Sequence, residues 1–154
     1  MSTMTSQTPQ PAPLLTPLPP QLVQALWDAA RAAQANAYAP YSHYAVGAAV
    51  LDDQGVVHAG CNVENAAYPQ GWCAEATALG ALVMSGARRV RAVLVLGGGG
   101  AWITPCGGCR QKLREFCEPD DTPILCATAD ALGPAYTLAQ LLPHSFGPDH
   151  LAQP

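Results

Sequence analysis

Three cysteines in two short segments have the residue type and spacing of a metal site. Cys73 opens the first segment, and Cys106 and Cys109 form a CxxC pair in the second. Three thiolates fill three corners of a tetrahedral zinc site and leave the fourth for water, which is the layout of a catalytic site. A closed structural site needs a fourth protein ligand. None of the histidines lies at ligand spacing to either segment; they are His43, His58, His144 and His150.

A carboxylate stands beside the first of these cysteines. Glu75 follows Cys73 by two residues, so it can reach a water activated by the metal without being a ligand. Zinc lowers the pKa of such a water toward neutrality, and an adjacent carboxylate can carry its proton. A thioredoxin-like dithiol would leave Cys73 and Glu75 without a role. A non-catalytic zinc-bound oligomerisation module would have no use for Glu75.

Both segments are expected to stand where a helix begins. Helices predicted over 73–85 and 106–116 would place Cys73 and Cys106 at helix N-termini, where the backbone dipole favours anions and lowers the pKa of a thiol. Cys106 and Cys109 are three residues apart and would share one helical face. The sequence therefore predicts two helix starts that face one metal ion.

The rest of the chain predicts one α/β domain over residues 21–154. Apolar periodicity, turn signals and a Val- and Leu-rich run over 90–96 define the other elements. These elements are helices over 21–36 and 137–142, and strands over 45–51, 56–59, 90–96 and 123–127. We expect a three-layer fold with a central mixed β-sheet and helices on both faces. Residues 1–20, with six prolines and no charge, predict a disordered leader.

Composition excludes several classes of function. The 154-residue chain has a net charge of −4, and its densest basic stretch, Arg88 to Arg91, is too thin to follow nucleic-acid phosphates. We expect no nucleic-acid partner, and no membrane segment, because no apolar run reaches about 18 residues. Without a secretory signal, the six cysteines are expected to be reduced in a cytoplasmic protein. Only 12% of residues are charged, which favours self-association, since about 25% is typical.

The two metal segments belong to a longer series of motifs. The series is Tyr38-Ala39-Pro40-Tyr41-Ser42 with Val46-Gly47-Ala48, Gly60-Cys61-Asn62-Val63-Glu64-Asn65-Ala66, Cys73-Ala74-Glu75, Pro105-Cys106-Gly107-Gly108-Cys109-Arg110-Gln111, and Leu141-Leu142-Pro143 with Phe146-Gly147. Over about residues 21–150, this series resembles the homotetrameric cytidine deaminases that bind zinc through three cysteines. Each motif taken singly is weak evidence, and together they are highly specific.

The resemblance implies a hydrolase that converts cytidine and deoxycytidine to uridine and deoxyuridine in pyrimidine salvage. Cys73, Cys106 and Cys109 would bind Zn²⁺. Glu75 would take a proton from the activated water, protonate ring nitrogen N3 and later protonate the departing ammonia. The expected partner is therefore a small-molecule nucleoside.

The resemblance also implies the residues that contact the nucleoside. Asn62 and Glu64 would hydrogen-bond the ribose 3′-hydroxyl, and Ala74 would lie against the substrate. Tyr44 stands where the family usually has a phenylalanine facing the base. Phe146 would reach into a neighbouring subunit's site, so the homotetramer would share its sites. Without the resemblance, Asn62 and Glu64 are better explained as turn and surface residues, and the two aromatics could be core residues.

Two departures and two rival functions remain. Ala76 stands where many three-cysteine members have an arginine that offsets the thiolate charge, and we expect Arg110 and the helix N-termini to share that task. Tyr44, in place of the family's phenylalanine, is the other departure, because the hydroxyl of a buried tyrosine needs a hydrogen-bond partner. Blasticidin-S-type aminohydrolases have similar metal motifs, but the Asn62 and Glu64 pair favours a nucleoside substrate. An RNA- or DNA-editing deaminase is disfavoured by the acidic, lysine-poor composition.

Overall fold

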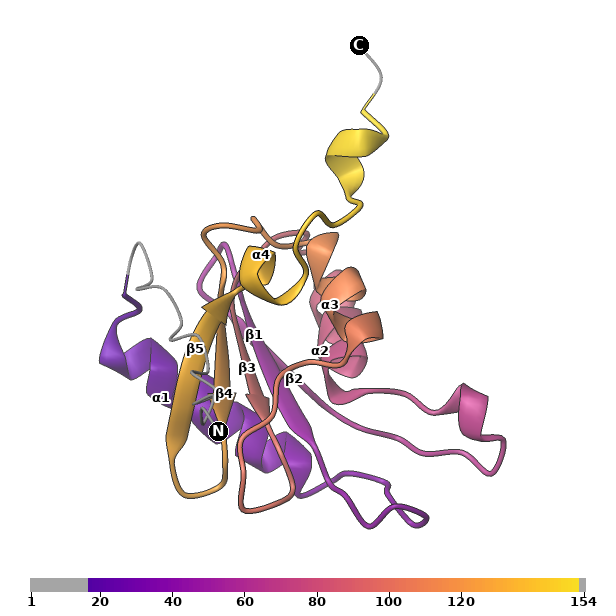
Figure 1. Ribbon diagram of the computed structural model, residues 1–154. Helices are drawn as coiled ribbons and strands as arrows, with labels where there is room; N and C mark the ends of the chain where they lie inside the picture. The colour runs from indigo at the N-terminus through magenta and orange to yellow at the C-terminus, as the bar shows by residue number, and fades with distance from the viewer. Residues whose placement is uncertain (1–16, 153–154) are drawn as a thin grey trace, which may run out of the picture.

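A single mixed sheet organises the computed structural model, which describes residues 17–152 (Figure 1). The strands, in chain order, are β1 (Gly47–Asp52), β2 (Val57–Cys61), β3 (Val90–Leu96), β4 (Pro123–Ala127) and β5 (Leu132–Thr137). Their order across the sheet is β2-β1-β3-β4-β5. Strands β3 and β4 run parallel, and every other neighbouring pair is antiparallel. The helices are α1 (Pro20–Gln34), α2 (Ala74–Met84), α3 (Gly107–Arg114) and α4 (Leu138–Leu141), with 3-10 turns η1 (Tyr68–Gln70) and η2 (Pro148–His150).

Helices cover both faces of the sheet, as predicted. Ala49 and Leu51 of β1 pack with Leu26 and Ala30 of α1 on one face. Val50, between them, packs on the other face with buried residues of α2, α3 and α4. This alternation follows from the two-residue period of a strand. Strand β3 lies between β1 and β4 and is covered on both sides, which explains its run of Val and Leu.

The strand register places the starts of two helices at the same end of the strands. Gly47 pairs with Cys61 at the end of β2 and also with Leu96 at the end of β3. The chain leaves β2 toward α2 and leaves β3 toward α3. Both helices therefore begin near this end of the strands, on the same face of the sheet.

Close packing between β2 and α2 fixes the start of α2. A Cβ atom on Gly60 would lie 2.6 Å from the Cβ atom of Thr77 and 2.7 Å from the carbonyl oxygen of Ala74. The Thr77 hydroxyl donates a hydrogen bond to the Cys61 carbonyl oxygen at 2.9 Å. Glycine at position 60 is thus required for α2 to approach the strand.

The predicted helices and strands are all present, with ends that differ by a few residues. The sequence prediction missed β5, which contains Gly133 and Pro134, two residue types that are rare in strands. Pro134 is tolerated because β5 is an edge strand that pairs with β4 alone. The last helix is shorter than predicted, a single turn with a capping box between Thr137 and Gln140. The predicted leader lies outside the described residues up to residue 16, and Pro20 is already in α1.

Candidate metal centre and active site

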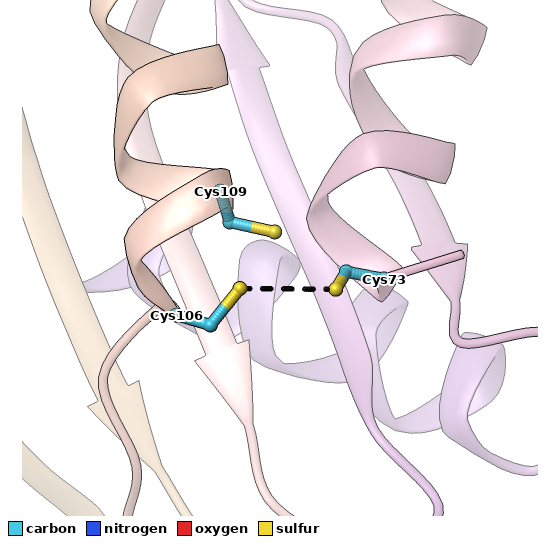
Figure 2. A group of neighbouring side chains, drawn as sticks. All are labelled: Cys73, Cys106 and Cys109. Atoms are coloured by element: carbon cyan, nitrogen blue, oxygen red, sulfur yellow. Dashed lines mark hydrogen bonds between the residues drawn. The ribbon is translucent and has the colours of Figure 1, made fainter. Parts of the chain in front are cut away.

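The sulfur atoms of Cys73, Cys106 and Cys109 lie together at the end of the sheet where α2 and α3 begin. The three Sγ atoms are all within 4.8 Å of one another, and Cys73 Sγ is 3.8 Å from Cys106 Sγ. Cys73 is the N-cap residue of α2, and Cys106 is the N-cap residue of α3. Figure 2 shows the sulfurs facing one another between the two helix starts. The helix positions predicted from sequence therefore account for the cluster.

The spacing of these sulfurs fits a tetrahedral zinc ion. Zn–S bonds of about 2.3 Å at tetrahedral angles put two sulfurs about 3.8 Å apart, which matches the Cys73 to Cys106 distance. All three cysteines are free, and thiolates are ligands that zinc prefers. The donor set holds three corners of a tetrahedron, as the sequence predicted.

Electrostatics in this cluster favour a bound cation. Burial raises the pKa of the Cys109 thiol far above its ordinary range, and the charges of Glu75 and the other two sulfurs raise it further. Burial also raises the pKa of Cys73. Burial acts in the same direction on Cys106, but the backbone N–H of Cys109 and hydrogen bonds from the neighbouring thiols outweigh it, so its pKa is lowered. A divalent cation stabilises all three thiolates at once and so relieves this repulsion.

Glu75 lies beside the sulfurs, in the first turn of α2. Its side chain is buried, and the Cys109 thiol donates a hydrogen bond to Glu75 Oε2 at 3.3 Å. Burial raises the pKa of Glu75; its backbone N–H, Cys109 and the charge of Lys112 offset part of that effect. A carboxyl group with a raised pKa holds a proton more readily than an exposed glutamate does, which suits it to proton transfer.

A cavity of about 390 Å³ opens onto the metal cluster, within the size range of small-molecule sites. It brings together six residues that the sequence singled out: Asn62, Glu64, Cys73, Ala74, Glu75 and Cys106. Four other lining residues were not predicted from the sequence: Gly71, Trp72, Ile103 and Thr104. Their signal was their position, since each stands within two residues of a metal motif.

Asn62 and Glu64 line this cavity and also hold the loop over residues 41–46. Asn62 Oδ1 accepts from the Val46 N–H at 2.8 Å, and Asn62 Nδ2 donates to the Tyr44 carbonyl oxygen at 2.9 Å. Glu64 Oε2 accepts from the Tyr41 N–H at 2.9 Å, and Oε1 accepts from the Ser42 hydroxyl. The hydrogen bond from Ser42 lowers the pKa of Glu64 and outweighs the opposing effect of burial, with help from backbone N–H groups of the loop.

The two predicted aromatic contacts lie outside the cavity of their own chain. The Tyr44 hydroxyl lies against Gly97, where a Cβ atom would be 2.9 Å away, and its ring extends over Gly99. Phe146 lies on the C-terminal segment, where Gln111 Nε2 donates to its carbonyl oxygen at 2.9 Å. Its side chain is 56% exposed. Neither residue is among those that line the cavity.

Arg110, which we expect to share in offsetting the thiolate charge, directs its hydrogen bonds to the loop before α3 and to Leu141. Its guanidinium donates to the carbonyl oxygens of Pro105 and Leu141 and to the Thr104 hydroxyl, at 2.7–2.8 Å. All three groups are oxygens, so Arg110 fastens the loop that leads into α3 rather than pairing with a sulfur. The cation that acts on Glu75 is Lys112, the single lysine of the chain, which the sequence analysis did not assign to the site.

Within the described residues, no helix combines the length and the apolar character needed to cross a lipid bilayer.

Comparison with known proteins identifies relatives over most of the chain. The family model for the cytidine and deoxycytidylate deaminase zinc-binding region matches residues 20–126. A cytidine deaminase of Sporosarcina psychrophila is 37% identical over 130 residues, which cover 84% of this chain and 95% of that protein. The match includes both metal motifs, since residues 73–109 lie inside the family region.

Solved structures share the fold. The crystal structure of cytidine deaminase from Mycobacterium tuberculosis has a TM-score of 0.72 and 41% identity, covering 81% of this chain and 97% of that one. Cytidine deaminase from Burkholderia pseudomallei has a TM-score of 0.70 and 37% identity, covering 80% and 98%. These likenesses confirm the predicted α/β architecture and its layers.

Proposed function

Since this chain belongs to the cytidine and deoxycytidylate deaminase family, we propose that it hydrolyses the amino group of cytidine and deoxycytidine. The products are uridine or deoxyuridine and ammonia. One observation carries the proposal: three convergent sulfurs and the buried carboxyl of Glu75 lie at the edge of a single cavity. A structural metal site has no need for a carboxyl in that place, whereas hydrolysis needs a group that moves protons.

Cys73, Cys106 and Cys109 would hold the zinc ion in this site. When bound, zinc acts as a Lewis acid that makes a water molecule a stronger nucleophile at neutral pH. The two helix N-termini stabilise the thiolates through their backbone dipoles. These dipoles, the guanidinium of Arg110 beside Pro105 and the ammonium of Lys112 are the positive groups that this chain offers to offset the negative charge.

Glu75 moves the protons of the reaction. It takes one proton from the attacking water and delivers it to N3 of the pyrimidine while oxygen bonds to C4. It then transfers the second proton to the amino group, and the C4–N bond breaks to release ammonia. The raised pKa of Glu75 suits it to hold and release each proton in turn.

Asn62 and Glu64 have the capacity to bind the ribose while they hold the loop. An asparagine amide carries two N–H donors, and Asn62 uses one of them on the Tyr44 carbonyl oxygen. A carboxylate accepts about four hydrogen bonds, and Glu64 accepts from the Tyr41 and Ser42 backbone and the Ser42 hydroxyl. The remaining donor and acceptor match a sugar hydroxyl, with Ala74 lining the same cavity.

The working form in this proposal is a homotetramer that shares its sites. Helix α2 is apolar on every side, yet Met84 is 86% exposed and Val83 is 37% exposed in the isolated chain. A helix that is apolar all round is normally covered all round. Phe146 would then cover the base in a neighbouring subunit, and Tyr44 would support the loop beside it. Pyrimidine salvage in the cytoplasm is the setting we propose, where six free thiols stay reduced.

The test is the ultraviolet absorbance of cytidine mixed with the zinc-loaded protein. We expect the wild type to remove the cytidine band and Glu75→Gln to be slower by about 10²- to 10⁴-fold with unchanged zinc content, because the proton carrier is gone. Glu115→Gln, an exposed glutamate at the end of α3, is the matched control and should keep full activity. Wild-type protein that holds zinc but leaves cytidine unchanged would refute the proposal.

A further inference from the structure

We propose that Arg114 is a positioning residue that holds the C-terminal arm, Ser145–His150, so that Phe146 is presented to the site of a second copy. The inference rests on the proposed function, in which subunits share their sites. It assigns a task to a residue that lies outside the cavity and at the far end of α3 from the metal cluster.

One guanidinium holds the arm at two points. Arg114 is the last residue of α3, and its side chain is only 12% exposed. Its Nε donates to the Ser145 hydroxyl oxygen at 3.0 Å, and its Nη2 pairs with the Asp149 carboxylate. Two contacts four residues apart fix the direction of the segment between them as well as its position. A planar guanidinium suits this geometry, because its donors lie in a rigid fork.

The middle of the arm packs directly on this guanidinium. A Cβ atom on Gly147 would lie 2.6 Å from Arg114 Nη1, so a larger residue would push the guanidinium away from the arm. The backbone of Gly147 is extended, with φ −152°, so glycine here matters through the space it leaves for the guanidinium. One turn earlier on α3, Gln111 Nε2 donates to the Phe146 carbonyl oxygen at 2.9 Å. Side chains of α3 therefore contact the arm at Phe146 and on both sides of it.

The aromatic ring is fixed but left open to solvent. Phe146 is 56% exposed, and its ring stacks on His150 with the centroids 5.1 Å apart. The Gly147 N–H donates to His150 Nδ1 at 3.1 Å, which closes the end of the arm. Figure 1 shows the arm extending beyond α4, away from the sheet. A preorganised aromatic side chain loses little entropy when it enters a neighbouring site. The contacts of Arg114 and Gln111 with the arm therefore strengthen the binding of Phe146 there.

The turn that leads into the arm is also held in an unusual conformation. His144 has a φ of 55°, which is the left-handed region that residues other than glycine rarely adopt. The surrounding contacts must hold such a residue in place, because its backbone conformation is strained. The guanidinium contacts to Ser145, immediately afterwards, supply that restraint.

A subunit-mixing experiment tests the proposal with the full-length, zinc-loaded protein. Glu75→Gln chains lack the proton carrier but keep an intact arm, and Phe146→Ala chains have the reverse defect. Mixed oligomers should recover cytidine deamination at sites that take Glu75 from one chain and Phe146 from the other. Arg114→Ala is then added to either the Glu75→Gln chain, which donates the arm, or the Phe146→Ala chain, which does not.

At cytidine concentrations well below KM, we expect Arg114→Ala to lower the recovered activity by about tenfold only when it is in the arm-donating chain. In the uniform Arg114→Ala enzyme, KM for cytidine should rise by about tenfold with kcat within about threefold, because substrate cover is lost and proton transfer is not. Arg89→Ala is the matched control, since Arg89 makes an exposed ion pair with Glu118. Equal loss from either chain, or no recovery without the Arg114 change, would overturn the proposal.

A second readout separates this inference from the proposed function. If the wild type does not deaminate cytidine, the proposed function fails, and hydrogen exchange of the arm amides decides the role of Arg114. Arg114→Ala should speed exchange at residues 145–151 by about tenfold or more, while exchange in β3 stays unchanged. Arg114→Lys should restore part of the protection, because an ammonium can still pair with Asp149. Unchanged exchange in Arg114→Ala would show that the residue does not hold the arm.

Discussion

Glu75 combines two properties that oppose each other. As a buried carboxyl beside three sulfurs it destabilises the metal-free fold when charged, and the same burial raises its pKa above the ordinary value. Such conflicts between stability and chemistry are typical of functional sites, where perturbed pKa values gather. The residue that we propose as the proton carrier therefore lowers the stability of the protein without its metal.

This conflict predicts how the stability of the metal-free protein depends on pH. The folded-state pKa of Glu75 is raised above the ordinary value of 4.5, so its stabilising effect is complete below that value and is lost as the pH rises through the folded-state pKa. We expect metal-free Glu75→Gln to melt higher than metal-free wild type at pH 7, on the order of a few degrees. The difference should shrink toward pH 4.

Thermal melts of chelator-treated protein between pH 4 and pH 8 give this comparison. Glu115→Gln, which removes an exposed carboxyl of the same kind, should follow the wild type at every pH. A melting-temperature difference between Glu75→Gln and wild type that is constant with pH would contradict the sign argued here.

At the scale of elements, the site depends on how closely α2 can approach the sheet. Cys73 and Glu75 are placed by the first turn of α2, and that turn is set by packing of Thr77 and Ala74 on Gly60. The second helix start, at Cys106, is held separately by the contacts that Arg110 makes around the loop before α3. The distances between the three sulfurs therefore depend on the relative position of α2 and α3.

Gly60→Ala should separate those elements. The added methyl group has no space against α2, so we expect a loss of about 1–3 kcal/mol in the free energy of unfolding and weaker zinc binding, as Cys73 moves away from Cys106. Urea unfolding and competition with a chromogenic chelator measure the two effects. Gly100→Ala has open space around the new Cβ atom and should change stability by less than about 0.5 kcal/mol. Wild-type zinc affinity in Gly60→Ala would show that α2 is placed by other contacts.

At the scale of the whole molecule, apolar surface is left uncovered on the isolated chain. The outer side of α2 exposes Val83 and Met84, and the C-terminal segment exposes Phe146 and Leu151. With 12% of residues charged, the surface has few groups to keep copies apart. Both features support the proposed assembly, in which these patches are buried between subunits.

Met84→Glu tests whether the outer side of α2 is an interface. A carboxylate there would have to be desolvated on assembly, so we expect the molecular mass by light scattering to fall from about four chains to one or two. Deamination should fall with it, because the shared sites would be incomplete. Met84→Leu keeps the apolar surface and should keep both mass and activity. A stable tetramer of Met84→Glu would place the interface elsewhere.

Much of the site could be predicted from the sequence because its chemistry is local. The spacing of Cys106 and Cys109, and of Cys73 and Glu75, is fixed by a helix start, and helix periodicity is visible in the sequence. Strand β3 was predictable for the same reason, since a strand covered on both faces needs a continuous apolar run. Strand β5 was not predictable, because pairing with β4 overrides the poor strand propensity of Gly133 and Pro134.

The amino-acid sequence by itself determined the three cysteines of the metal cluster, the carboxyl group beside them, the class of fold and the scarcity of charge. Only the tertiary structure decided that Arg110 bonds to oxygens, that Lys112 acts on Glu75, and that Arg114 holds the arm. The physical reason is that helix and strand signals depend on near neighbours in the chain. The partners of a long polar side chain depend on which distant segments packing brings within about 3 Å.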